Sequence, residues 1–344
     1  MVASSFDVGR LEEFPRVTFA HTPTPIEEMK NLSRRVGGAR LFVKRDDCTG
    51  LAFGGNKVRQ LEYYFGEALA RSADTVLITG AVQSNFVRVA AAAARKSGLE
   101  CHVQLEERVS DVDPIYRSSG NVLLDRLLGA TISSYPEGED EAGADRRLSE
   151  IADELAARGR SPYVIPLGPG HASLGALGYV RAAREIVEQI AAQQLEIDEV
   201  VVASGSGQTH AGLLFGLRAL GSQVRVTGVC VRRSADEQTL RIRRHCDSIA
   251  SLLDVATPVA DADILLLDGF LAPAYGVPGP SAIDALERAA RDEGLLLDPV
   301  YTAKAMAGCL DRARVESGGR LLFVHTGGQP ALFAYEGLLT GFSD

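Results

Sequence analysis

The sequence of 344 residues contains no tryptophan, only three methionines and only five cysteines. The cysteines are scattered and odd in number, and no two of them form a CxxC pair. This spacing argues against a zinc ribbon and against a disulfide scaffold. The six histidines are equally dispersed and form no HExxH motif, so we expect no metal centre.

Lysine is also scarce. Of the 36 basic residues only five are lysines, and the rest are arginines. The lysines are Lys30, Lys44, Lys57, Lys96 and Lys304. Any chemistry that requires an amine therefore has few candidate residues.

Two further absences argue against whole classes of protein. No apolar run approaches the roughly 18 to 20 residues of a membrane span. The net charge of −9 argues against a nucleic-acid surface, because phosphate contacts need a clustered excess of lysine and arginine. Residues 1–14 carry acidic side chains and lack an apolar core, so no signal peptide is predicted. We therefore expect a cytoplasmic protein that binds neither membrane nor nucleic acid.

What the sequence does contain is an alternation of short apolar runs with helical patterns from about residue 40 onward. Strands are predicted at 41–43, 75–79, 102–105, 163–166, 199–203, 224–230 and 321–325. Helices are predicted at 57–71, 86–96, 146–158, 175–193, 209–220, 281–293 and 303–315. This alternation is typical of βαβ units and predicts an α/β fold with parallel sheets covered by helices on both faces. The length allows one large domain or two closely packed domains.

Two segments interrupt this pattern. Residues 136–145 (PEGEDEAGAD) are acidic and are predicted to form a solvated loop without a functional role, leading into a helix. Residues 166–173 (PLGPGHAS) are rich in glycine and proline. They are predicted to form a crossing between domains, and such crossings often lie beside an active cleft.

Four segments have residue types suited to chemistry, and the first holds Lys57. Gly54 and Gly55 precede a predicted helix, and glycines allow the backbone to approach a ligand closely. Asn56 is predicted to be the N-cap of that helix. A lysine in the first helical turn lies in the positive field of the helix N-terminus, which lowers its pKa and favours the neutral amine that attacks an aldehyde. An ordinary surface lysine is the alternative.

The second and third segments are turns from a strand into a helix. Ser84 follows the strand TVLITG, and its hydroxyl and the amides after it are placed to receive a carboxylate. The alternative is that Ser84 or Asn85 only caps the helix. Residues 205–209 (GSGQT) follow the strand EVVVAS and are predicted to bind phosphate through backbone amides and the Ser206 and Thr209 hydroxyls. A structural tight turn is the alternative there, and the loop does not match a Walker A motif.

The fourth group lies in the C-terminal third. Tyr275 stands in a loop of helix-breaking residues (AYGVPG), and Tyr301 precedes a predicted helix. A phenol can donate or accept a hydrogen bond and can move a proton. A packed structural role is the alternative for each tyrosine. The HTGG motif at 325–328 follows a buried strand.

Together these segments resemble the family of D-cysteine desulfhydrases and 1-aminocyclopropane-1-carboxylate (ACC) deaminases, which also contains L-cysteate sulfo-lyases. The matching motifs are HTPTP (21–25), KRDDCTGLAFGGNKVRQLE (44–62), GAVQSNFVRVAAAAA (80–94), GNVLLDRLLGA (120–130), LGALGYV (174–180), SGSGQTHAGL (204–213), AYGVPG (274–279), LDPVYTAKAM (297–306) and HTGG (325–328). They are collinear and span nearly the whole chain, which makes the resemblance specific.

The resemblance implies a tryptophan-synthase-β-like α/β fold, type II among pyridoxal-phosphate enzymes. This fold has two three-layer domains with mostly parallel, twisted sheets. A small domain at 51–168 would be inserted in a larger one, formed by 1–50 and 169–344, that binds the cofactor. A homodimer is implied by the resemblance alone.

The resemblance also implies roles for individual residues. Lys57 would hold pyridoxal 5'-phosphate as a Schiff base and act as the Cα base, with Ser84 or a tyrosine as the other candidates for the base. Ser84 and Asn85 would hold the substrate carboxylate and the ring hydroxyl of the cofactor. Tyr275 and Tyr301 match the active-site tyrosines. The other cofactor contacts would come from Gly205, Ser206, Gly207, Gln208, Thr209, Gly327 and Thr302, the last at the pyridine nitrogen.

The implied chemistry is an elimination. A base removes the proton from the substrate Cα, the group on Cβ departs, and the resulting aminoacrylate hydrolyses to pyruvate and ammonia. Thr302 stands where the ACC deaminase branch has a glutamate, and a neutral hydroxyl suits elimination better than ring opening. The expected substrate is therefore a small amino acid of the 3-substituted alanine type, D-cysteine first and L-cysteate second, with sulfide or sulfite leaving.

Other functions remain open on the sequence. An ACC deaminase is one, and a β-replacement synthase of the same fold is another, although such synthases usually carry a Ser-x-Lys motif rather than GGNK. A non-catalytic amino-acid-binding protein could dispense with Lys57. A nicotinamide oxidoreductase is disfavoured because the GxGxxG motif is incomplete.

Two departures from the family pattern border the expected substrate. Phe86 stands where relatives usually place histidine or glutamine beside the substrate carboxylate. The segment GPGHAS is longer than the GGSN-type segment of relatives, and it contains His171. Phe86 and His171 are both expected to contact the substrate. Because of these two departures, the sequence does not determine the leaving group or the D or L configuration of the substrate. A bulkier apolar leaving group is compatible with Phe86 and His171.

Overall fold

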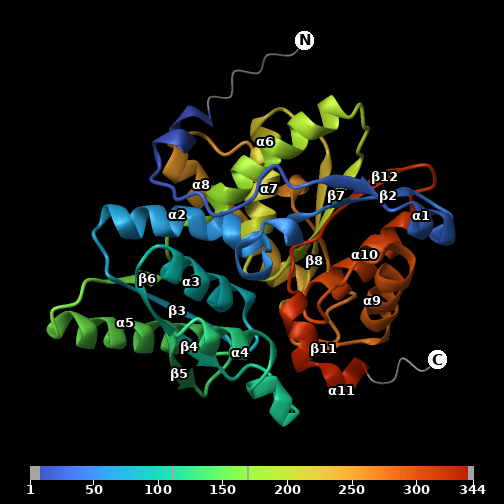
Figure 1. Ribbon diagram of the computed structural model, residues 1–344. Coiled ribbons are helices and arrows are strands. Elements are labelled where there is room, and N and C mark those ends of the chain that lie inside the picture. Colours follow the sequence, from blue (N-terminus) through green and yellow to red (C-terminus); the bar gives the residue numbers. More distant parts are fainter. Residues whose placement is uncertain (1–7, 111, 169, 340–344) are drawn as a thin grey trace.

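The computed structural model describes residues 8–110, 112–168 and 170–339, and its strands form two large sheets and one short hairpin (Figure 1). The larger sheet has the strand order β1-β2-β12-β7-β8-β9. Its strands are β1 (Ile26–Glu28), β2 (Arg40–Lys44), β12 (Arg320–Val324), β7 (Glu199–Ser204), β8 (Arg225–Cys230) and β9 (Leu265–Leu267). All neighbours are parallel except β1 and β2.

The smaller sheet has the strand order β5-β4-β3-β6, and all its pairs are parallel. Its strands are β5 (Thr131–Tyr135), β4 (Glu100–Glu106), β3 (Thr75–Ala81) and β6 (Pro162–Ile165). The hairpin pairs β10 (Pro273–Ala274) with β11 (Val277–Pro278). The prediction of an α/β fold with mostly parallel sheets is confirmed.

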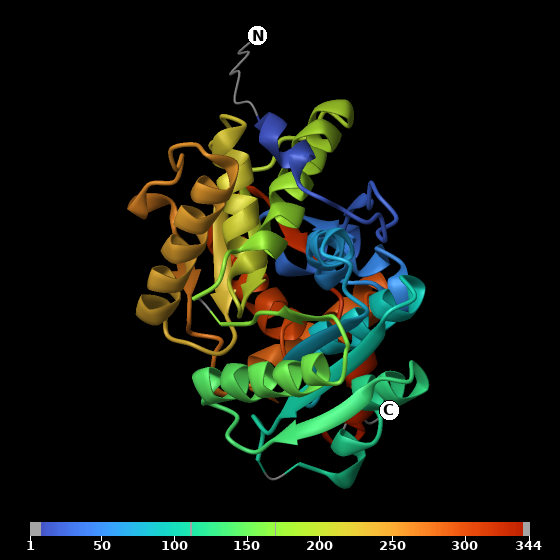
Figure 2. The ribbon, with the colours of Figure 1, turned by 90° about the vertical axis from the view of Figure 1, so that its left-hand side faces the viewer.

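Helices cover both faces of each large sheet. The helices are α1 (Lys30–Val36), α2 (Asn56–Ala70), α3 (Asn85–Lys96), α4 (Gly120–Leu127), α5 (Glu141–Ala157), α6 (Leu177–Ala192), α7 (Gln208–Ala219), α8 (Ala235–Leu253), α9 (Pro280–Glu293), α10 (Thr302–Val315) and α11 (Glu336–Leu339). On the larger sheet α6, α7 and α8 pack on one face, and α1, α9 and α10 pack on the other. On the smaller sheet α5 lies opposite α3 and α4. In the turned view α5 (green) lies with the smaller sheet in the lower half of the molecule (Figure 2).

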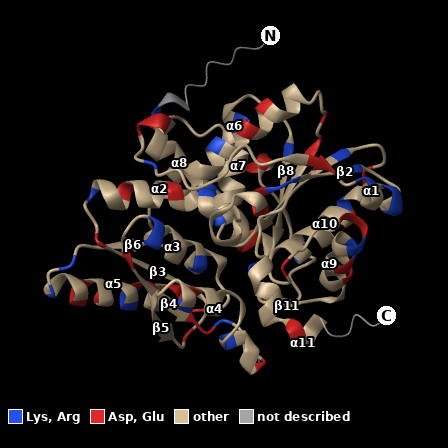
Figure 3. Cartoon of the chain, in the orientation of Figure 1, with Lys and Arg blue, Asp and Glu red and all other residues tan. Residues whose placement is uncertain are grey.

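Helix α2 joins the two halves because it packs on α3 of the smaller sheet and on α6 of the larger one. The alanines of α3 are buried, and their short side chains allow α3 to lie close to its own sheet and to α2 at once. Both signs of charge are distributed over the outer helix α5 (Figure 3). Within the described residues no helix is long and apolar enough to cross a membrane.

All strands of the smaller sheet fall within the predicted small domain at 51–168. The division into domains remains a prediction, and Pro169, at its boundary, lies outside the described residues. Residues 1–7, part of the segment at 1–14 that argues against a signal peptide, also lie outside them. Each predicted strand and helix is present, with ends that differ by a few residues.

One local prediction is wrong. The N-cap of α2 is Gly55, and Asn56 is the first helical residue. Its side chain instead donates a hydrogen bond from Nδ2 to Thr209 Oγ1 at 2.8 Å. Asn56 therefore ties the start of α2 to the start of α7.

Candidate active site

A cavity lies where the carboxyl ends of β3 and β7 face each other, the edge at which ligands bind in parallel α/β sheets. Most of the predicted site residues line it. They are Lys57, Ser84, Asn85, Phe86, Gly205, Ser206, Gly207, Thr209, Tyr275, Tyr301 and Gly327. Residues from both halves of the chain thus meet in one place.

Lys57 lies in the first turn of α2 with its amine in this cavity. Gly55, at φ 107°, makes the approach possible, because a Cβ there would lie 2.9 Å from the Thr326 carbonyl oxygen. Lys57 Nζ donates to Gln60 Oε1 at 3.2 Å and lies 5.0 Å from the ring centre of Phe86. Burial lowers the pKa of Lys57 to about 8. A substantial fraction of the amine is therefore neutral near physiological pH.

Two other buried lysines also have lowered pKa values, so the pKa alone does not identify the lysine that can react with a ligand. Burial lowers the pKa of Lys44, and it lowers that of Lys304 to about 8. Lys304 Nζ, however, donates to the carbonyls of Leu271 and Ala274, both at 2.7 Å. Lys44 is paired with Glu185. Among the described lysines only Lys57 lines the cavity, so it is the amine available to a ligand.

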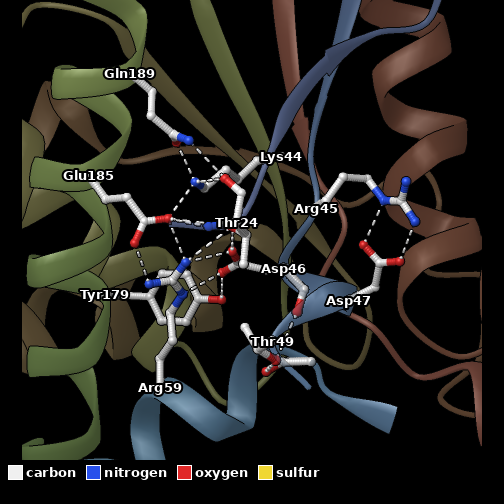
Figure 4. Close-up of polar contacts among 11 residues, drawn as sticks. Thr24, Lys44, Arg45, Asp46, Asp47, Thr49, Arg59, Tyr179, Glu185 and Gln189 are labelled. Atoms are coloured by element: carbon white, nitrogen blue, oxygen red, sulfur yellow. Dashed lines mark hydrogen bonds and ion pairs between the residues drawn. The ribbon is translucent and has the colours of Figure 1, made fainter. Parts of the chain in front are cut away.

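The start of α2 is held from behind by a buried polar network (Figure 4). Asp46 accepts hydrogen bonds from Arg59 at 2.9 and 3.0 Å and from the Tyr179 hydroxyl at 2.6 Å. Arg59 also donates to Glu185 at 2.9 Å. The Asp46 carbonyl accepts the amide of Gly55 at 3.1 Å. The network therefore fixes the backbone two residues before Lys57.

Residues 205–209 form an anion cradle at the N-terminus of α7. Gly207 is left-handed at φ 96°, and a Cβ there would lie 2.8 Å from His245 Cδ2. Arg241 Nε donates to the Ser206 carbonyl at 2.8 Å and Arg233 donates to the Gly205 carbonyl at 3.3 Å, and both arginines also line the cavity. The loop lines the cavity at the N-terminus of α7, and the amides of a helix N-terminus favour negative charge.

Thr209 adds a hydroxyl to the cradle. Its Oγ1 accepts hydrogen bonds from Asn56 Nδ2 at 2.8 Å and from Gln60 Nε2 at 2.9 Å. A threonine oxygen has two lone pairs and one hydrogen, so both acceptor positions are filled and the hydrogen remains for a ligand. A bound acceptor oxygen such as that of a phosphate satisfies it.

Ser84 and Asn85 begin α3 on the opposite wall. Ser84 is the N-cap, and its Oγ accepts the Val87 amide at 3.3 Å, so the predicted cap is confirmed. Asn85 Oδ1 accepts a hydrogen bond from Asn121 Nδ2 at 3.1 Å, which turns the Asn85 amide nitrogen to the cavity side as a donor. Phe86 lies next to them, 5% exposed, and gives Lys57 an apolar neighbour.

The two tyrosines form a pair. Their hydroxyl groups are hydrogen-bonded to each other, and their ring centres lie 6.0 Å apart. Burial and the neighbouring Tyr275 hold the pKa of Tyr301 well above its ordinary value. Tyr301 is therefore protonated at neutral pH.

Three predicted site residues do not line the cavity. Thr302 is fully buried, and its Oγ1 donates to Asp298 Oδ1 at 2.6 Å. Gln208 exchanges hydrogen bonds with the Tyr64 hydroxyl. His171 lies in a separate surface hollow beside Tyr163. Their roles as the pyridine-nitrogen partner, a cofactor contact and a substrate contact remain predictions.

Five charged residues of the lining were not found from the sequence. They are Arg108, Glu141, Arg232, Arg233 and Arg241. Glu141 begins α5 and lines the cavity, so the prediction of a solvated loop over 136–145 is wrong from this residue onward. The one local signal in the sequence for these charged residues was the pair Arg232 and Arg233, which stands just after the apolar strand predicted at 224–230.

Comparison with known proteins decides the family. A model of the pyridoxal-phosphate dependent enzyme family matches residues 17–327. The chain belongs to this family. Its cofactor is therefore pyridoxal 5'-phosphate. The residues that line the cavity fit this group, because Lys57 would offer an amine to the aldehyde carbon and the loop at 205–209 would hold the phosphate.

One curated relative and one solved structure refine this assignment. A D-cysteine desulfhydrase of Klebsiella pneumoniae (strain 342) is 45% identical over 328 residues, which cover 94% of this chain and 97% of the relative. The crystal structure of an ACC deaminase homologue has a TM-score of 0.86 at 38% identity and covers 96% of this chain and 97% of its own. The chain is thus a pyridoxal-phosphate-dependent carbon–sulfur lyase by class.

A more distant structure shares the fold alone. An O-ureido-L-serine synthase has a TM-score of 0.66 at 18% identity and covers 96% of this chain and 95% of its own. This likeness confirms that the family fold extends over both halves of the chain.

The pKa of Lys57 predicts how the family member takes up its cofactor. Only the neutral amine attacks an aldehyde, so the rate of attachment to the apoenzyme should rise about tenfold per pH unit below pH 8 and level off above it. Stopped-flow absorbance at fixed cofactor concentration measures this rate. A rate that stays constant between about pH 6 and pH 9 would contradict the lowered pKa.

The cradle predicts a second effect. Gly207→Ala places a Cβ at a left-handed backbone position and against His245, so we expect cofactor affinity to fall about tenfold. Equilibrium dialysis of the cofactor measures this affinity. Gly98→Ala is the matched control, because Gly98 has φ 74° but no heavy atom within 4 Å of its Cβ position. Equal losses in both variants would show that backbone strain alone, and not the cradle, is responsible.

Proposed function

We propose that the chain catalyses the α,β-elimination of D-cysteine to pyruvate, ammonia and sulfide. The observation that carries this proposal is the position of Lys57, a partly neutral amine in a cavity between an anion cradle and a pair of tyrosines. The similarity to a D-cysteine desulfhydrase over 94% of the chain supports the substrate.

Different residues of the cavity perform different steps of the proposed reaction. The amides at the start of α3, with Ser84, bind the substrate carboxylate. When bound, pyridoxal phosphate supplies the electron sink that makes the Cα proton acidic. Lys57 takes that proton as general base. Tyr301, which stays protonated, donates through its pair with Tyr275 to the departing sulfur.

L-cysteate is the second candidate substrate, and the arginines of the lining favour it because its sulfonate is negatively charged. An ACC deaminase and a β-replacement synthase are less well supported, since the relative at 45% identity is a desulfhydrase.

Product analysis tests the proposal. The purified protein, loaded with cofactor, is incubated with D-cysteine, L-cysteine, L-cysteate or ACC, and 2-oxo acid and sulfide are measured. We expect pyruvate and sulfide in equal amounts from D-cysteine without an added nucleophile. A protein that holds its cofactor yet releases no pyruvate from D-cysteine would overturn the proposal, and 2-oxobutyrate from ACC would favour the deaminase.

We also propose a cytoplasmic homodimer. Large apolar side chains are exposed near α4 and α11, and they are Leu123, Leu127, Leu296, Phe333 and Leu338. A second copy of the chain would remove them from water. Light scattering should then give twice the 36.7 kDa of one chain, and a mass of one chain would contradict the dimer.

A further inference from the structure

Glu141 lies among three guanidinium groups at one end of the cavity. Its Oε1 pairs with Arg232 at 2.7 Å and with Arg233, and its Oε2 pairs with Arg241 at 3.3 Å. We call these four residues the arginine cluster. Glu141 comes from the smaller-sheet half of the chain, whereas the arginines follow β8 or lie on α8.

The arginine cluster has an excess of positive charge away from bulk water. The side chains of Arg232, Arg233 and Arg241 are 7%, 17% and 8% exposed. Burial would raise the pKa of Glu141, but Arg241, Arg233 and Arg232 outweigh it and lower that pKa, so the carboxylate is charged. The one other carboxylate bound to these arginines within the described residues, Glu139, is 75% exposed. One carboxylate, whose side chain is 20% exposed, thus faces three largely buried cations.

The three arginines are not equivalent. Arg233 and Arg241 also donate to backbone carbonyls of the anion cradle at 205–209. The hydrogen bonds of Arg232 within the described residues go to residues 138–141 instead. The Arg232 guanidinium lies 5.9 Å from the ring centre of Tyr275. Arg232 is therefore the member of the cluster that faces the tyrosine pair, where the leaving group of the substrate is expected.

We propose that Arg232 and Arg233 form an anion subsite for a negatively charged substituent on the substrate Cβ, and that Glu141 occupies this subsite until the substrate replaces it. The ligand class is a 3-substituted alanine whose substituent carries its own sulfonate or carboxylate. A neutral thiol leaves Glu141 in place. A sulfonate displaces it and, when the Cα proton goes to Lys57, departs with the electron pair of the C–S bond as sulfite.

This inference rests on the proposed function for its substrate class, but the subsite itself can be tested without turnover. Calorimetric titration of the cofactor-loaded protein compares methanesulfonate with methanesulfonamide, its neutral analogue of similar shape, and acetate tests the carboxylate. We expect methanesulfonate to bind at least about tenfold more tightly than methanesulfonamide. Equal affinities would overturn the proposal.

Variants locate the binding. Glu141→Gln removes the competing charge and should strengthen methanesulfonate binding about tenfold, whereas Arg232→Gln should weaken it by a similar factor. Glu150→Gln is the matched control, because Glu150 lies on the same helix and pairs with Arg147 at the surface. Methanesulfonate binding that is unchanged in Glu141→Gln would place the anion elsewhere, for example at the start of α3, and would also overturn the proposal.

Turnover separates this failure from that of the proposed function. If D-cysteine yields pyruvate but Glu141→Gln leaves the kcat/KM ratio of L-cysteate to D-cysteine unchanged, the subsite is wrong and the elimination stands. If no 3-substituted alanine yields pyruvate while the methanesulfonate results hold, the subsite stands as an anion site and the proposed function is wrong.

Discussion

Replacing Lys57 with alanine should abolish the cofactor absorbance of the purified protein and lower pyruvate release by at least about a thousandfold, the range of one general base. In the proposed function Lys57 is both the amine that holds the cofactor and the base beside the substrate, so we expect the variant to lose two functions at once. The absorption spectrum and a pyruvate assay measure the two losses. The fold should persist, because within the described part of the chain the Lys57 side chain donates a single hydrogen bond, to Gln60.

Lys96→Ala is the control for this variant. Lys96 lies in the last turn of α3 and is exposed, so neither the spectrum nor the rate should change. A Lys57→Ala protein that keeps a tenth or more of the wild-type rate would show that another group takes the Cα proton. Ser84 and Tyr301 would then be the next candidates.

The second large effect is on stability. Asp46→Asn removes the carboxylate charge that pairs with Arg59 in the buried network behind α2, leaving the charge of Arg59 less compensated (Figure 4). Breaking a buried ion pair costs about 3–5 kcal/mol. We expect the urea midpoint of unfolding to fall accordingly. Because the chain has no tryptophan, far-UV circular dichroism is the suitable probe.

A surface pair provides the comparison. Arg147→Gln breaks ion pairs to Glu150 and Glu154 on exposed α5, and such pairs contribute about 0–1 kcal/mol. A loss in Asp46→Asn no larger than in Arg147→Gln would contradict the role given to the buried network. A large loss with the cofactor spectrum preserved would confirm that the network acts on stability rather than on Lys57.

Local signals account for the parts of the site that the sequence predicts. The turns around Ser84 and Gly207 each follow an apolar strand and begin a helix, and parallel strands bring such turns to one edge of a sheet. Lys57 is found from a different signal, the pair Gly54 and Gly55 that precedes its helix. Helix α8 was not predicted, although the capping box of Ser234 and Glu237 marks its start.

The rest depends on contacts between residues far apart in the chain. Glu141 meets Arg232 across 91 positions, and Asp46 meets Tyr179 across 133. The spacing of apolar residues along the sequence does not indicate which distant residues form such pairs. For Thr302 the sequence did not indicate that Asp298, only four residues earlier, accepts a hydrogen bond from its hydroxyl. A hydroxyl at a helix start is open to a ligand only if no nearby carboxylate binds it first.

The most direct test of the central claim is to locate the cofactor on the chain. Borohydride reduction of the cofactor-loaded protein makes the bond to the amine permanent, and protease digestion with peptide mass analysis finds the modified lysine. The account predicts that the added mass is on the peptide that contains Lys57. Added mass on Lys44 or Lys304, or on no lysine at all, would contradict it.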